Sequence, residues 1–308
     1  MQRGGRSPSD ATEIYGVGFL LINCARATDA DPRPGSDTRR RRSPMKRLGF
    51  VAAVMLVLAG MESTLPAAGP VPSGSSVVVY LVRGEHVAPV RRVVVRTAAP
   101  ARASLTALLA GPTATERRLG YTTAIPAPTR LRSVSLSDRV LTVDLSSRFA
   151  AGGGSASMLL RVAQLVYTAT AFPSVDRVAF RLDGKPVGAI GGEGVVVRPP
   201  VNRSTFEAEA PAILVEQPLP GDRVSTRLRI RGSANVFEAQ FEIDVVTPSG
   251  ARLAHRAVLA SAGTGTRGGF DVTIPLASAA RRLVVVAYDR SAKDGARIDL
   301  VRVPVTLR

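Results

Sequence analysis

The chain has 308 residues, a formal net charge of +17, no tryptophan and 45% apolar residues. This apolar content excludes wholesale disorder, and the length predicts two domains because single domains usually run to about 100–200 residues. Only three of the 41 basic residues are lysines, and a compositional preference for arginine explains this imbalance better than a dedicated polyanion site, which would need clustered charge.

The N-terminal region predicts export. Met45 and two basic residues precede an apolar run at 48–60, which is followed by small residues. This pattern is typical of a secretory signal peptide over residues 45–69, and the run is too short to span a bilayer. We expect Met45 to be the true start, with residues 1–44 a mis-called or disordered extension.

Cysteine usage agrees with an exported protein that needs no covalent crosslink. Cys24, the single cysteine, lies upstream of the predicted signal peptide, so we expect neither a disulfide nor a thiolate metal site in the mature protein. Met61 stands where a lipobox would place its cysteine, which removes the expected point of lipid attachment. The predicted location is extracellular or associated with the cell envelope.

Residues 77–197, after a linker at 70–76, predict an α+β domain. Pro100 and Gly111 are typical of the two ends of a helix, and Ser155 or Ser157 is expected to cap a second one. The predicted elements are strands at 75–84 and 88–97, a helix at 100–110, a hairpin at 130–149, a helix at 155–172 and a strand at 176–182. This order predicts a mixed β-sheet with two helices on one face.

A two-residue corner is predicted at Asp183-Gly184, because both residue types tolerate positive φ. Asp183 beside Lys185 also has the residue types of a catalytic acid and a cation, but the turn alone accounts for the sequence.

Residues 198–211 are rich in proline and lack periodicity, so they predict a linker. From residue 212 to 308 no helix is predicted. Strands are expected near 212–216, 224–231, 237–246, 252–260, 268–275, 281–289 and 297–307. Seven short strands separated by turn residues predict an all-β, immunoglobulin-like sandwich.

Four segments of the first domain resemble the GerMN domain of bacterial sporulation and spore-germination proteins: LLAGPTATERRLGYTTAIP (108–126), TVDLSSRF (142–149), AQLVYTATAFPSVDRVAFRLDGKPV (163–187) and GGEG (191–194). Residues 211–246 look like the immunoglobulin-like domain that accompanies it in that family. The resemblance implies a non-enzymatic cell-envelope protein that takes part in protein assembly at a membrane surface. Many relatives are lipoproteins, and Met61 departs from that pattern.

Residue types that carry chemistry all have simpler interpretations. Tyr167 is expected to cover the edge of the core with its hydroxyl in water, and Asp144 to be a solvated or ladder-edge carboxylate rather than a general base. The glycines at 152–154 lack the Lys-Ser/Thr ending of a phosphate loop. His86 and His255 fall in different predicted domains, so we expect no metal, no cofactor and no enzymatic activity.

In SANVFEAQ, Phe237 next to Asn235 and Glu238 leaves two interpretations open. The segment is either a turn into a strand with Phe237 in the core, or a contact surface.

Two functions from different classes remain. The leading one is a scaffold or assembly factor that binds other envelope proteins, of unspecified identity and oligomeric state. The alternative is direct binding of anionic cell wall or membrane through the first domain; nucleic acid is excluded as a partner by export. The candidate contacts are Arg91, Arg92, Arg117, Arg118, Arg177 and Arg181.

Overall fold

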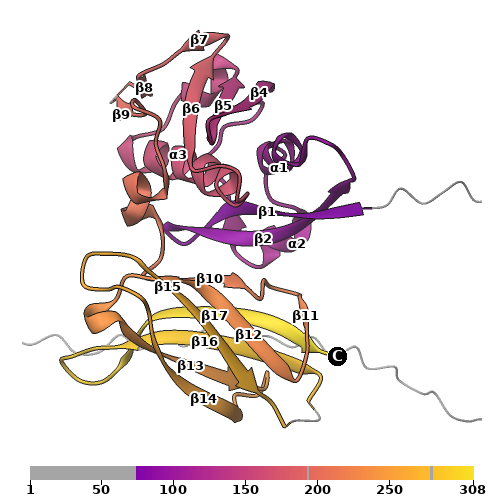
Figure 1. Ribbon diagram of the computed structural model, residues 1–308, viewed down its shortest axis with the longest axis vertical. Helices are drawn as coiled ribbons and strands as arrows, with labels where there is room; N and C mark the ends of the chain where they lie inside the picture. The colour runs from indigo at the N-terminus through magenta and orange to yellow at the C-terminus, as the bar shows by residue number, and fades with distance from the viewer. Residues whose placement is uncertain (1–73, 193, 278–279) are drawn as a thin grey trace, which may run out of the picture. The chain divides into compact units, whose positions relative to one another are not determined.

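The structure is a computed structural model that describes residues 74–192, 194–277 and 280–308 (Figure 1). These residues all belong to one compact unit. The predicted extension at 1–44, the signal peptide at 45–69 and Cys24 lie outside the described residues.

The first domain begins with a small sheet in the order β2-β1-β3. Its strands are β1 (Gly74–Arg83), β2 (His86–Val95) and β3 (Tyr121–Thr122). Helix side chains cover much of the open edge of β1: Ser104 donates to the Val78 carbonyl, Gln164 donates to the Tyr80 carbonyl, and Thr168 accepts from the Tyr80 amide. This edge is therefore closed to another strand by polar side chains.

A second, mixed sheet has the order β4-β5-β6-β7. Its strands are β4 (Leu131–Ser137), β5 (Val140–Leu145), β6 (Arg177–Leu182) and β7 (Lys185–Pro186). β5 and β6 run parallel, as a crossover through a helix requires, and the other pairs are antiparallel. Asp183 and Gly184 join β6 to β7 with φ of 48° and 82°, which confirms the predicted corner.

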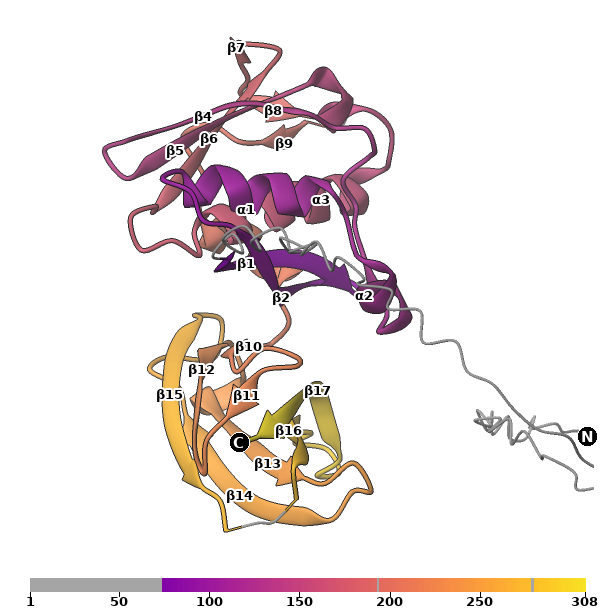
Figure 2. The same ribbon diagram turned by 90° about the vertical axis from the view of Figure 1, so that its right-hand side faces the viewer.

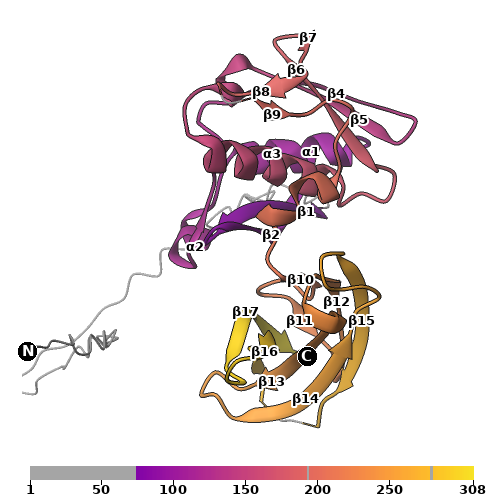
Figure 3. The same cartoon turned by 90° about the vertical axis from the view of Figure 1, so that its left-hand side faces the viewer.

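Helices α1 (Pro100–Leu109) and α3 (Ser155–Ala169) lie between these two sheets, as Figures 2 and 3 show from opposite sides. A short helix α2 (Ala114–Arg118) follows α1. The α+β class is confirmed, but the single sheet expected from the sequence is two sheets with the helices packed between them. Neither serine caps α3: its N-cap is Gly154, and no side chain bonds there.

The residues expected to form a linker are packed rather than free. Phe206 and Ala210 are buried and belong to the core of the first domain. Phe206 lies in a 3-10 segment, η2 (Arg203–Glu209). The first domain also contains the 3-10 turn η1 (Ser147–Ala150) and the short pair β8 (Ala189–Ile190) and β9 (Val195–Val196).

The second domain is a sandwich of two sheets in the orders β10-β12-β15 and β11-β17-β16-β13-β14. The elements are β10 (Ile213–Gln217), β11 (Arg223–Val224), β12 (Arg227–Ala234), η3 (Phe237–Ala239), β13 (Gln240–Val246), β14 (Arg252–Leu259), β15 (Gly268–Pro275), β16 (Arg282–Arg290) and β17 (Arg297–Leu307). Alternate residues of the strands fill one apolar core, so the predicted immunoglobulin-like sandwich is confirmed.

Candidate functional site

Phe237 is held out into solvent at the turn between β12 and β13. Its neighbours Val236 and Ala239 are buried, whereas the Phe237 side chain is 66% exposed. The interpretation that places Phe237 in the core is therefore wrong. Of the two interpretations of this segment, only the contact surface is consistent with an exposed phenyl ring.

The backbone of this turn is in an unfavourable conformation. Glu238 has φ 51° and ψ 20°, and Ala239 has φ 58°, so two successive residues with side chains adopt the left-handed region. Each such residue costs roughly 1–2 kcal/mol. Strain of this kind persists only where the surroundings fix the conformation, and it concentrates at functional sites.

The loop that precedes β15 fixes the turn. Thr264 accepts from the Glu238 amide at 3.0 Å and donates its own amide to the Val236 carbonyl at 2.9 Å. Asn235 accepts from the Gly265 amide at 2.9 Å. A Cβ atom at Gly263 would lie 2.4 Å from the Ala239 nitrogen, so only glycine fits there. Phe237 is consequently presented on a rigid support rather than on a loose loop.

Arg91 and Arg92, on β2, are engaged within the chain. The Arg91 guanidinium donates to both carboxylate oxygens of Asp222, at 2.7 and 2.8 Å, and this hydrogen bonding raises the pKa of Arg91. Arg92 is largely buried and donates to Glu116 at 2.8 Å and to the Gly111 carbonyl at 3.0 Å. Burial opposes ionisation of Glu116, but hydrogen bonds from Arg92 and Thr113 hold its pKa below the ordinary value.

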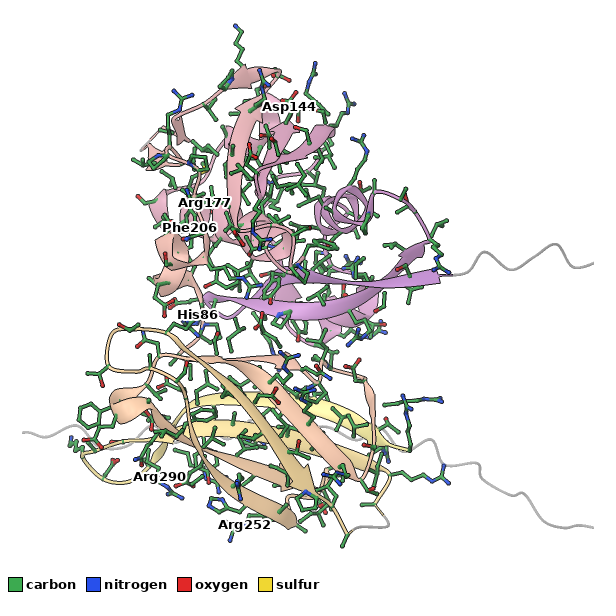
Figure 4. The ribbon with its side chains drawn as sticks, in the orientation of Figure 1. His86, Asp144, Arg177, Phe206, Arg252 and Arg290 are labelled. Atoms are coloured by element: carbon green, nitrogen blue, oxygen red, sulfur yellow. The ribbon has the colours of Figure 1, made fainter. Side chains whose placement is uncertain are left out.

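The other four candidate arginines lie on two separate elements. Arg117 and Arg118 are in α2, where they donate to the Pro112 carbonyl and to Thr115. Arg177 is exposed on β6, in the other sheet (Figure 4). Arg181 is exposed on the same strand and donates to the Gly184 carbonyl. The structure does not gather the six arginines into one patch, and their role as partner contacts stays a prediction.

Asp144 and Asp183 both bond to backbone amides near the β6–β7 corner. Asp144 is buried, not solvated, and accepts from the Gly184 amide at 3.0 Å. Asp183 accepts from the Ser147 amide at 3.1 Å, and this contact lowers its pKa. Both therefore stabilise the strand ends around the β6–β7 corner.

Tyr167 differs from its expected position at the wet edge of the core. It is fully buried, and its hydroxyl has no hydrogen-bond partner among the residues that the structure describes. Burial raises the pKa of Tyr167 to about 12. The Arg203 guanidinium lies 4.9 Å from the centre of its ring, and that cation–π contact uses the ring rather than the hydroxyl.

His86 lies in β2, and His255 lies in β14. His255 Nδ1 lies 2.9 Å from an Asp244 carboxylate oxygen, in the second domain, while His86 begins β2. Within the described ranges, no three His, Cys, Asp or Glu side chains are grouped so that they could hold a metal ion.

Arg161 was not singled out from the sequence, although it organises the glycine segment before α3. It is 2% exposed, and its guanidinium donates to the carbonyls of Phe149, Ala151, Gly152 and Ala124 at 2.6–3.1 Å. Burial lowers the pKa of Arg161, and nearby Arg148 lowers it further. An arginine on the apolar face of a predicted helix is the only sequence signal that points to this role.

Taken together, the chain is a two-domain protein in which a layered α+β domain precedes an immunoglobulin-like sandwich. Residues 78–188 match the family model described as sporulation and spore germination, and residues 212–296 match the immunoglobulin-like domain of bacterial spore germination. Each of the two domains thus matches one family model, which confirms the resemblance seen in the sequence.

Solved structures show weaker similarity. The first GerMN domain of the sporulation protein GerM from Bacillus subtilis is 20% identical, with a TM-score of 0.36 over 42% of this chain and 98% of that chain. A putative lipoprotein from Clostridium perfringens is 16% identical, with a TM-score of 0.33 over 45% and 93%. The tandem GerMN domains of GerM are 14% identical, with a TM-score of 0.38 over 67% and 63%. No curated protein matches the sequence. These identities and scores support no statement about function.

Proposed function

We propose that this chain is an exported, non-catalytic cell-envelope protein that acts as a scaffold or assembly factor. It binds another envelope protein, and the Phe237 turn is a principal contact. The family models that match the two domains support a role related to that of sporulation and spore-germination proteins.

The observation that carries the proposal is the exposed phenyl ring on a strained, hydrogen-bonded turn. A preorganised aromatic side chain loses little conformational freedom on binding, and such residues dominate the energy of protein interfaces. A projecting ring fits a concave apolar pocket on a folded partner. Burying it would contribute about 1.5–3 kcal/mol.

The positions of the three residues with potentially reactive side chains support a non-catalytic role. Asp144 and Asp183 bond to turns, and Tyr167 is sealed in the core. Each of these three side chains is thus accounted for by folding.

Export rests on the predicted signal peptide at 45–69, and Met61 argues against a lipid anchor at that point. In the part of the chain that the structure describes, none of the helices has the length and apolar character needed to cross a bilayer.

The alternative, direct binding of an anionic wall polymer or lipid through the first domain, has less support. Two of its six candidate arginines, Arg91 and Arg92, already face Asp222 and Glu116. A guanidinium that is hydrogen-bonded to a carboxylate has fewer donors left for a phosphate.

The test is site-specific photocrosslinking in cells of the source bacterium. The full chain carries a photoreactive phenylalanine analogue either at Phe237 or, as a control, at Leu136, which is 49% exposed on β4 of the first domain. We expect a protein adduct from the envelope fraction at position 237 and none at position 136.

The identified partner is then purified and titrated with the wild-type chain, Phe237→Ala and Leu136→Ala. Loss of the buried ring should weaken binding by about 10-fold to 100-fold, and the control should bind like the wild type. Adducts with lipid alone, or equal affinities for all three proteins, would contradict the proposal.

A further inference from the structure

The outer face of β12 carries a row of three arginines. Leu228 and Ile230 point into the core of the sandwich, and the alternate residues Arg227, Arg229 and Arg231 point to solvent. We refer to these three as the arginine row. β15 pairs with β12 along the whole row, whereas β10 reaches only Arg231, so the strand edge beside Arg227 and Arg229 is left open on that side.

The row has more positive charge than its surroundings neutralise. Successive members are about 7 Å apart along the strand. Asp271 on β15 lies 2.5 Å from Arg229 and 3.3 Å from Arg231, so one carboxylate serves both guanidinium groups. Arg227 makes no ion pair with any residue that the structure describes. Both arginines that contact Asp271 remain more than half exposed.

The row ends in a hollow of about 240 Å³ between β11 and β12. Arg223, Arg227, Arg229 and Arg308 line it, together with Ser225 and Gln217. Asp222 also lines it, but that carboxylate is hydrogen-bonded to Arg91. Four of the residues that line this hollow are therefore arginines.

In the five-stranded sheet of the same domain, by contrast, two arginines are paired with carboxylates. Arg290 donates to Glu242 at 2.8 Å, and Arg297 donates to the buried Asp244 at 2.6 Å. Like charges side by side on one sheet face are destabilising. The arginine row is thus a place where the second domain keeps a local surplus of cations that its own carboxylates do not balance.

We propose that the arginine row and its hollow bind a linear polyanion whose phosphate groups repeat along an extended chain. Planar guanidinium groups donate in pairs to phosphate oxygens, and a straight row at a fixed spacing matches an extended polymer. The site is in the immunoglobulin-like domain, not among the six arginines considered in the first domain, and it is independent of the Phe237 contact.

The experiment titrates the full chain into fluorescently labelled long-chain inorganic polyphosphate at several salt concentrations. The row variant is Arg227→Gln combined with Arg231→Gln, which leaves the Arg229–Asp271 pair in place. The matched control is Arg252→Gln combined with Arg256→Gln, which removes the same charge from exposed positions on β14, in the other sheet.

We expect the row variant to bind about 10-fold to 100-fold more weakly, since each contact to a charged group contributes appreciably. Its plot of log affinity against log salt should also be shallower by about 1.4. The control should weaken binding by less than about threefold, because charges on the other sheet act on the polyanion only through salt-screened, long-range attraction. Asp271→Asn removes the shared carboxylate, keeps the row and should tighten binding, which guards against a trivial loss of folding.

Three results would overturn the proposal. Equal weakening by the row variant and the control would assign binding to net charge alone. Tighter binding to phosphatidylglycerol vesicles or to duplex DNA than to polyphosphate would assign the row to another class of partner. Absence of polyphosphate binding at low salt would remove the site altogether.

Discussion

Removing the hydroxyl of Tyr167 should stabilise the first domain. Tyr167 is fully buried in α3, and its hydroxyl has no hydrogen-bond partner among the described residues. Its ring packs 5.4 Å from the ring of Tyr80, which is also buried but has a bonded hydroxyl. Two neighbouring tyrosines in one core thus differ in a single respect, and that makes them a matched pair.

The expected magnitudes have opposite signs. A buried hydroxyl without a partner costs about 1–3 kcal/mol of desolvation, so Tyr167→Phe should raise the free energy of unfolding by most of that amount. Tyr80 donates to the Glu216 carboxylate and accepts from Arg203 at 3.3 Å. Tyr80→Phe loses a hydrogen bond to a charged group and should cost about 1.5–3 kcal/mol. The unfolding free energies of the two variants should therefore differ by about 2.5–6 kcal/mol.

Urea and thermal unfolding followed by circular dichroism measure this difference, because the chain has no tryptophan for fluorescence. Tyr167→Phe should raise Tm by about 2–12 °C, and Tyr80→Phe should lower it by a similar or larger amount. The reasoning is refuted if Tyr167→Phe destabilises the protein as much as Tyr80→Phe does. A bonded hydroxyl at position 167 would then be established.

Alkaline pH gives a second measure of the same residue. Burial raises the pKa of Tyr167 to about 12, more than Arg267 and Arg203 lower it, while an exposed tyrosine titrates near 10. The unfolded chain loses this proton first, so Tyr167 leaves the free energy of unfolding unchanged with pH below about 10 and lowers it as the pH rises from about 10 to about 12. Tyr167→Phe should flatten the fall in stability across that range.

Arg161→Met should lower the unfolding free energy, measured in urea, by about 3–5 kcal/mol because four carbonyls lose their donor. Arg161→Lys should recover only part of this loss. A loss below about 1 kcal/mol for Arg161→Met would contradict the role of Arg161. Gly184→Ala should lower the unfolding free energy by about 1–2 kcal/mol because Gly184 has φ 82°. Gly188→Ala, where φ is not positive, should be nearly neutral. Equal losses for the two variants would contradict the role of positive φ at the corner. The hydrogen bond from Arg290 holds the pKa of Glu242 at about 2, against 4.5. Its stabilising effect is therefore lost as the pH falls from about 4.5 towards 2, and an acid titration of Glu242→Gln that loses stability just as steeply as the wild type would contradict that assignment.

Much of the fold follows from local patterns. Alternation in β12 predicts which side chains enter the sandwich core, because side chains of a strand point to opposite faces. Asp183-Gly184 predicts its own backbone angles. The order of elements and the motifs between residues 108 and 246 also identify both families.

The errors arise where a second element covers a face that local pattern leaves open. Tyr167 was expected at the wet edge of the core because one sheet leaves one side of a helix in water. α3 lies between two sheets, and all residues from Arg161 to Ala169 are buried, so no such edge exists. The exposed position of Phe237 likewise depends on the hydrogen bond from the next residue, Glu238, to Thr264, which is distant in sequence.

By itself, the sequence determined the class of each domain, most of the helices and strands and the Asp183-Gly184 turn, because each depends on residues close together along the chain. The export signal at 45–69 stays a prediction. Only the tertiary structure decided that the first domain has two sheets, that Phe237 is exposed and that Arg91 and Arg92 are engaged. It also showed that the second domain keeps the arginine row largely unbalanced. These features depend on contacts between distant segments, such as Arg91 with Asp222, and sequence spacing does not report which segments meet.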